Sequence, residues 1–439
     1  MNNKKSILHK DGVNYLVPFI MVTSCFALWG LLNNMTDNLV PAFAKIFMID
    51  AVNSSLVQVA FYGAYAVLAI PAAIIIKKYS YRTGILVGLG FYIIGALGYI
   101  PSALLQCYEL FLFSIFVLAC GLSVLETTCN PFVLSLGTQE TSIRRLNLAQ
   151  AFNPLGSLTG IFLAKYVILA HLSDADLATR RAMAPETLES LRDTELFWVC
   201  APYVGLVAIA IIIWCFFFRS SIPDTRADEP KLNFSESIKK LATLPRYYWG
   251  VLAQFFYIGL QISVWTWTIK YAMTIFSNEN INEAAAAQYY LYAIILFIVC
   301  RWICTFLIKY INSAILLSVF AFLGVFVSIC TIYLPSHLSI WFLIAISGCM
   351  SLMFPTIYGI ALCNMGDEMK LGAAGLIMSI MGGAIITPIM GLTIDAGTFS
   401  SFVGCYSGAE AAVRSSFFIP VFCFVVVAIY GLCNVRNER

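Results

Sequence analysis

The chain has 439 residues, of which 60% are hydrophobic and only 11% are charged, and its mean hydropathy is +0.85. A soluble domain carries about 25% charged residues, so this composition excludes an ordinary soluble enzyme or binding module. The net charge of +3 is too small to indicate a nucleic-acid partner.

Twelve apolar segments follow one another along the chain, each with the roughly 20 residues that a helix needs to cross a bilayer. We expect them at 15–43, 54–77, 83–102, 108–136, 145–170, 195–218, 248–275, 285–309, 313–333, 338–363, 372–396 and 414–434. Most lysines and arginines fall in the loops of one side, which predicts that both termini are cytoplasmic.

A polar stretch divides these segments into two sets of six. We predict an N-terminal six-helix bundle at 1–218, a cytoplasmic linker at 219–247 with a short amphipathic helix at 234–244, and a C-terminal six-helix bundle at 248–439. The 14 cysteines are scattered singly and the three histidines lie near predicted loops. We therefore expect reduced, buried thiols, no metal site and no cofactor.

Glu126 lies deep in the fourth predicted span, and no lysine or arginine stands within a dozen positions of it. Hydrocarbon disfavours the charged form of a carboxyl that has no partner. Such a group can take up and release a proton as its exposure changes. The alternative is a protonated side chain that only hydrogen-bonds to neighbouring helices.

Asn34 and Asp37 share one face of the first span because they are three residues apart. Counted from Tyr15, Asp37 lies about 33 Å along a helix that rises 1.5 Å per residue, which is close to the outer surface. From the residues alone, a role in proton transfer and simple solvation or helix capping both remain open for Asp37.

Two polar stripes are rich in amides. Asn147, Gln150 and Asn153 recur every three residues in the fifth span, and Gln261 and Trp265 share a face of the seventh. Amides both donate and accept hydrogen bonds, and an indole offers a flat apolar surface, which together suit a sugar. Interhelical hydrogen bonding of the amides and interfacial anchoring of the tryptophan are the alternatives.

The charged groups placed deep in the spans are few and acidic. Arg301 lies toward the cytoplasmic end of the eighth span, where we expect it to snorkel or to brace the inner gate. An anionic substrate would require a cation that faces the cavity. The pattern therefore favours a neutral, polyhydroxylated substrate that moves together with a proton.

Six stretches, in this order and at these distances, resemble the fucose:proton symporters of the major facilitator superfamily along nearly the whole chain. They are WGLLNNMTD at 29–37, IPAAIIIKKYSYR at 70–82, LETTCNPF at 125–132, RLNLAQAFN at 145–153, VLAQFFYIGLQ at 251–261 and GGAIITPIMG at 382–391. The resemblance implies an all-α membrane protein with twelve transmembrane helices in two pseudo-symmetric six-helix bundles, which works by alternating access around a central cavity.

The resemblance also implies the site and the substrate. Proton coupling is expected at Asp37 and Glu126, and the polar lining is expected to consist of Asn34, Asn130, Gln150, Asn153, Gln261 and Trp265. We predict proton-coupled import of a neutral monosaccharide, L-fucose above others, by a monomer in the bilayer of a bacterial inner (plasma) membrane. The partners are then the sugar, the proton and the lipid.

Two alternatives are weighed against this function. A symporter for another hexose or for an amino sugar would use the same chemistry. A membrane-embedded enzyme would need a cluster of His and Asp, or of Cys and His, near one face, and the sequence offers no such cluster.

Overall fold

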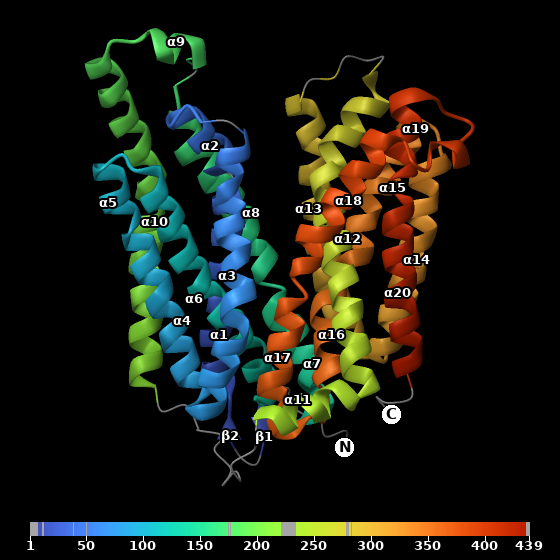
Figure 1. The fold of residues 1–439 in the computed structure, drawn as a ribbon. Coiled ribbons are helices and arrows are strands. Elements are labelled where there is room, and N and C mark those ends of the chain that lie inside the picture. The colour runs from blue at the N-terminus through green and yellow to red at the C-terminus, as the bar shows by residue number, and fades with distance from the viewer. Residues whose placement is uncertain are drawn as a thin grey trace. The chain divides into compact units, whose positions relative to one another are not determined.

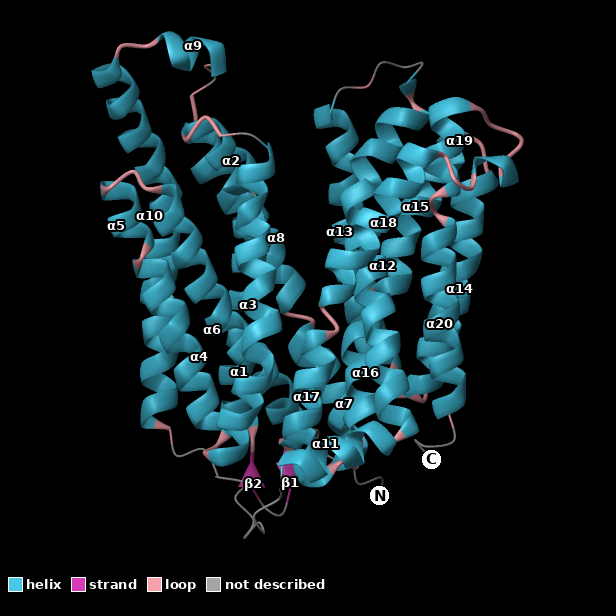
Figure 2. Ribbon diagram, in the orientation of Figure 1, coloured by secondary structure: helices cyan, strands magenta, loops and turns pink. Residues whose placement is uncertain are grey.

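The computed structural model describes residues 8–10, 13–37, 39–49, 51–173, 175, 177–220, 234–277, 281 and 283–435, and almost all of them are helical (Figures 1 and 2). Two short strands, β1 (His9–Lys10) and β2 (Val13–Asn14), pair in antiparallel fashion ahead of the first helix. The described helices pack into two compact units.

Unit 1 comprises Met1–Thr138 and Phe152–Lys231. After the strands, its elements are α1 (Leu16–Asp37), α2 (Leu39–Ile46), α3 (Ala51–Lys78), α4 (Tyr81–Leu97), α5 (Tyr99–Leu104), α6 (Tyr108–Ser135), α8 (Asn153–Leu163), η2 (Ala164–Ile168), η3 (Leu169–His171), α9 (Leu177–Ala182) and α10 (Pro185–Arg219).

Unit 2 comprises Gln139–Ala151 and Leu232–Arg439. Its elements are η1 (Gln139–Thr141), α7 (Ser142–Gln150), α11 (Phe234–Thr243), α12 (Pro245–Ile275), α13 (Glu283–Leu307), α14 (Ser313–Tyr333), α15 (Ser336–Met350), α16 (Met353–Leu362), η5 (Gly366–Glu368), α17 (Met369–Met378), α18 (Met381–Ala396), η6 (Ser400–Phe402), α19 (Gly408–Ser415) and α20 (Phe418–Asn434). The amphipathic helix expected at 234–244 is confirmed as α11.

Eleven segments of the described chain are long and apolar enough to cross a membrane. The remaining predicted span, the seventh in chain order, is α12. With 31 residues, α12 is long enough to cross, but Gln254 and Gln261 lower its mean hydropathy. The two spans with the weakest apolar signal, the fifth and the seventh, are thus the two that carry the predicted sugar-binding stripes.

Local residue chemistry sets several helix ends. Ser80 caps α4 by accepting a 3.1 Å hydrogen bond from the amide of Thr83, and Asn312 caps α14 by accepting from the amides of Ala314 and Ile315. Such caps satisfy amide groups that have no partner inside the helix.

Several predicted spans are interrupted within their length, among them the eleventh, between α17 and α18 at Ser379 and Ile380, and the fifth and tenth, which share a further feature. The fifth consists of α7 and α8, which meet at Ala151 and Phe152, and the tenth consists of α15 and α16, which meet at Ser351 and Leu352. A proline, which has no amide hydrogen to donate, lies in the first turn of each second half, at Pro154 and at Pro355. Each break leaves carbonyl groups that need donors from elsewhere.

The first half of the fifth span packs within unit 2, although the sequence places it in the N-terminal bundle. Gly359 of α16 lies against Ile143 of α7, and Asn147 donates a 3.3 Å hydrogen bond to the hydroxyl of Thr356. The second half, α8, belongs to unit 1. There a Cβ at Gly156 would lie only 1.9 Å from the carbonyl oxygen of Ala27, so α1 and α8 pack backbone to backbone.

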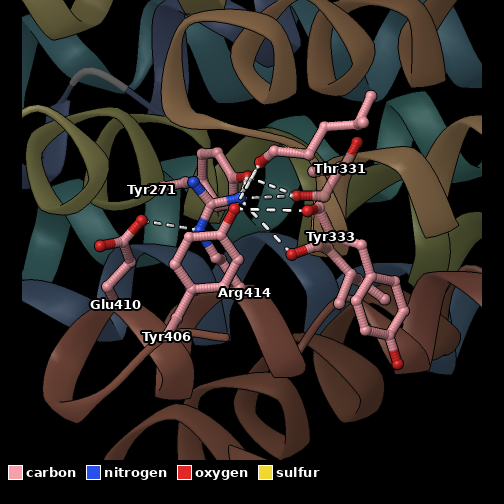
Figure 3. Close-up of polar contacts among 8 residues, drawn as sticks. Tyr271, Thr331, Tyr333, Tyr406, Glu410 and Arg414 are labelled. Carbon is pink, nitrogen blue, oxygen red and sulfur yellow. Dashed lines mark hydrogen bonds and ion pairs between the residues drawn. The ribbon is translucent and has the colours of Figure 1, made fainter. Parts of the chain in front are cut away.

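A buried arginine joins several elements at one end of unit 2 (Figure 3). Arg414 of α19 is fully buried, and its guanidinium lies 4.0 Å from the centre of the Tyr406 ring. It donates to Glu410 at 2.8 Å and to the carbonyl of Leu334 at 2.8 Å, and at longer range to further carbonyls at the end of α14. A cation is thereby placed at the negative end of that helix.

Candidate proton and substrate site

Glu126 is the member of the predicted proton-coupling pair whose side chain the structure describes. Its side chain is 1% exposed, and it belongs to α6, a helix that is buried along most of its length. Within the described residues, its Oε2 atom has no hydrogen-bond partner and no lysine or arginine pairs with it. The hydroxyl of Tyr65 on α3 faces this carboxyl.

Asn130 lies one turn further along α6 and is fully buried. Its Nδ2 atom donates a 2.9 Å hydrogen bond to the backbone carbonyl of Glu126. Asn130 therefore stabilises the local backbone of α6 at Glu126.

Two further predicted residues meet around Gly30 of α1. Asn34 donates a 3.2 Å hydrogen bond to the carbonyl of Gly30, and the backbone of Asn153 on α8 lies directly against Gly30. The Nδ2 atom of Asn153 donates to the carbonyl of Phe26 at 3.3 Å. Asp37 is the last residue of α1, and its side chain lies outside the described part of the structure.

The stripe on α12 is built as a row of hydrogen-bonded and aromatic groups. The hydroxyl of Tyr257 donates to Oε1 of Gln261 at 2.9 Å, and the indole Nε1 of Trp265 donates to the hydroxyl of Ser347 at 3.1 Å. The ring of Phe297 packs edge-on against Trp265, with centroids 5.2 Å apart. These contacts fix the orientation of both an amide and an indole.

Gln150 is the last residue of α7 and is 3% exposed. Its carbonyl accepts a 3.2 Å hydrogen bond from Nη1 of Arg301, whose Nε atom donates to the carbonyl of Ser351 at 2.6 Å. The guanidinium also lies 4.8 Å from the centre of the Phe297 ring. Arg301 is only 4% exposed, so it does not snorkel, and it instead binds the ends of two half-helices.

Sequence reasoning missed Tyr257 and Ser347, which hydrogen-bond to Gln261 and Trp265, and Tyr65, which lies near Glu126. Tyr257 stands one helical turn before Gln261, so its spacing could have identified it. Tyr65 and Ser347 lie on other helices, and only the packing brings them to Glu126 and Trp265. Among the described residues, no group of three or more His, Cys, Asp and Glu side chains could hold a metal ion.

Comparisons with known proteins identify the family of the chain. The model of the Major Facilitator Superfamily matches residues 19–388. The L-fucose-proton symporter of Haemophilus influenzae is 39% identical over 424 residues, covering 95% of this chain and 96% of that protein. The glucose/galactose transporter of Brucella abortus is 31% identical over 427 residues, covering 97% and 95% of the two chains.

A solved structure is similar over almost the full length. The crystal structure of the Escherichia coli fucose:proton symporter FucP superposes with a TM-score of 0.85 at 31% identity, covering 97% of this chain and 99% of that one. The twelve predicted spans in two sets of six agree with that fold. The chain is therefore a multi-pass membrane protein that belongs to the Major Facilitator Superfamily.

Proposed function

We propose that this protein imports L-fucose together with a proton across a bacterial inner membrane, with both termini in the cytoplasm. It is a transporter and not an enzyme. The observation that carries the proton-coupled function is Glu126, an acid with 1% exposure and no cationic partner among the described residues. The similar proteins named as L-fucose-proton symporters support the choice of sugar.

The chemistry of Glu126 gives a mechanism for coupling. Burial without a cation favours the neutral, protonated carboxyl, so an empty transporter that faces outward holds a proton there. Rearrangement of the loaded protein exposes the carboxyl to the less acidic cytoplasm, where the proton leaves. Each ligand then shifts the population of states only through its different affinity for them. Asp37, which the family resemblance pairs with Glu126, is the second proposed proton carrier.

The sugar is proposed to bind through amides and an indole. The predicted lining residues supply donors and acceptors suited to hydroxyl groups; they are Asn34, Asn130, Gln150, Asn153, Gln261 and Trp265. The C–H face of a pyranose can pack on the indole of Trp265. We propose that the protein works as a monomer, with lipid as its other partner.

A second candidate is import of another hexose or of an amino sugar. The Brucella relative named as a glucose/galactose transporter favours it, because its similarity to this chain also extends over nearly the whole length. Competition of unlabelled sugars against labelled L-fucose separates the two candidates.

The deciding experiment uses the full chain in proteoliposomes with an imposed pH gradient, acidic outside. We expect L-fucose to accumulate, and each added sugar that is a substrate to move protons. Glu126→Gln should abolish gradient-driven accumulation and leave some exchange of sugar for sugar, since an amide cannot carry a proton. Full accumulation by this variant would remove Glu126 from the coupling mechanism.

A further inference from the structure

Gln254 of α12 is buried without any hydrogen-bond partner. Its side chain is 0% exposed, and within the described residues both Oε1 and Nε2 lack a partner. A buried polar group left unsatisfied destabilises the fold, because it has lost its hydrogen bonds to water without gaining others. Native structures keep few such groups, and each calls for an explanation. One explanation is that the amide finds hydrogen-bond partners in a different conformational state of the protein.

Gln254 continues the row that already holds Gln261 and Trp265. Tyr257 lies one turn beyond Gln254, and it contacts Gln261 through the 2.9 Å hydrogen bond described above. At 1.5 Å per residue, Gln254 lies about 10 Å from Gln261 along the helix. It stands nearer to Pro245, the end of α12 that follows the proposed cytoplasmic linker.

The helix that covers this part of α12 is α16, the second half of the broken tenth span. One turn before Gln254, a Cβ at Gly250 would lie 2.7 Å from Ala361 of α16, and one turn after it, Tyr257 packs edge-on against Phe354. The opposite face of α16 contacts α7, where Asn147 donates to Thr356. Asn147 is also fully buried, and its Oδ1 atom has no partner in the described chain. Unsatisfied amide atoms thus flank α16 on both sides.

We propose that Gln254 forms a release subsite for the transported sugar, which is uncovered when α16 moves away from α12 by bending at Ser351 and Leu352. The amide then hydrogen-bonds the hydroxyl groups of a monosaccharide that has left Gln261 and Trp265 and is moving toward the cytoplasm. Movement of α16 therefore gives the Gln254 amide the hydrogen-bond partners that it lacks when α16 covers it. This inference rests on the proposed function.

The test compares four full-length proteins in proteoliposomes: the wild type, Gln254→Met, Gln254→Asn and Ser328→Ala. Methionine matches glutamine in length and removes both unsatisfied atoms. Ser328 of α14 is the matched control, because its hydroxyl is equally buried and has no partner in the described structure, yet it lies outside the α12 row. The measurements are equilibrium binding of labelled L-fucose, and the rates of equilibrium exchange and of efflux.

We expect Gln254→Met to bind L-fucose with an unchanged Kd and to exchange and release it about three- to tenfold more slowly, which is the effect of one net hydrogen bond. Ser328→Ala should match the wild type, and Gln254→Asn should recover part of the rate. The proposal would be overturned if Gln254→Met exchanged and released sugar at the wild-type rates. It would also be overturned if binding and exchange fell by the same factor, because that result indicates a structural role. Failure of the wild type itself to move any sugar would instead refute the proposed function.

Discussion

Nη1 of Arg301 donates a hydrogen bond to the carbonyl of Gln150, and through it the eighth span binds the broken end of the fifth. Nε of the same guanidinium donates a hydrogen bond to the carbonyl of Ser351 at the break in the tenth span. A single buried cation therefore satisfies carbonyls at the negative ends of α7 and α15.

Replacing Arg301 by lysine should destabilise the protein. An ammonium lacks the planar fork that reaches two carbonyls, and a hydrogen bond to a charged group contributes about 1.5–3 kcal/mol. We expect a lower melting temperature in detergent and slower transport. The control is Lys270→Met, because Lys270 and Asp395 form an exposed pair at 3.5 Å, and such pairs contribute about 0–1 kcal/mol. Equal melting of Arg301→Lys and the wild type would show that the bridge adds no stability.

Ser347→Ala should weaken L-fucose binding in the wild type but not in a Trp265→Phe background, so the double variant should be no worse than Trp265→Phe alone. Both remove the same 3.1 Å hydrogen bond that orients the indole, which contributes about 1 kcal/mol net. Isothermal titration with L-fucose completes this double-mutant cycle. Strictly additive losses would mean that the two side chains act independently.

Gly156→Ala should disrupt unit 1. The added methyl group would lie 1.9 Å from the carbonyl oxygen of Ala27, and backbone atoms cannot move aside as a flexible side chain can. We expect low expression and early melting in a thermal scan. Gly205→Ala is the control, since nothing lies within 4 Å of a Cβ there, and alanine favours a helix by about 1 kcal/mol over glycine. A normal melting curve for Gly156→Ala would contradict the close packing of α1 and α8.

Arg414→Met should destabilise unit 2 more than Glu410→Gln does. The arginine variant leaves the carbonyls of Thr331, Ile332 and Leu334 without their cation, whereas the Glu410 side chain is 31% exposed and can turn to water. We expect a loss of about 1.5–3 kcal/mol for Arg414→Met, the contribution of a hydrogen bond to a charged group. Thermal melting of the two variants side by side measures the difference, and equal melting would argue against the role of the carbonyl contacts.

Much of the fold could be predicted from the sequence, because a bilayer imposes a simple rule on apolar length. Glu126 could be located in the same way, since a lone acid in an apolar run is conspicuous. The breaks in the spans could not be predicted from the sequence. Pro131 and Pro355 occupy similar places in the sequence, yet Pro131 lies inside the continuous helix α6 while Pro355 begins α16.

The partners of the predicted site residues were also beyond prediction. Tyr65 and Ser347 come from helices distant in sequence, and a single sequence gives no measure of which helix faces which. The sequence leaves two expectations open for Arg301, snorkelling and bracing of the inner gate, because a long cationic side chain near a membrane surface often snorkels. Its true partners are carbonyls at helix breaks, which only a structure reveals.

The weak hydropathy of α12 has a consequence for how the protein is made. Two glutamines and a row of tyrosines and tryptophans suit a sugar, but they also reduce the free energy gained when that helix leaves the translocon for lipid. We expect α12 to need α13 beside it before it inserts stably. Nascent chains that stop just after Ile275 should leave α12 accessible to water-borne labels, and chains extended past Leu307 should protect it.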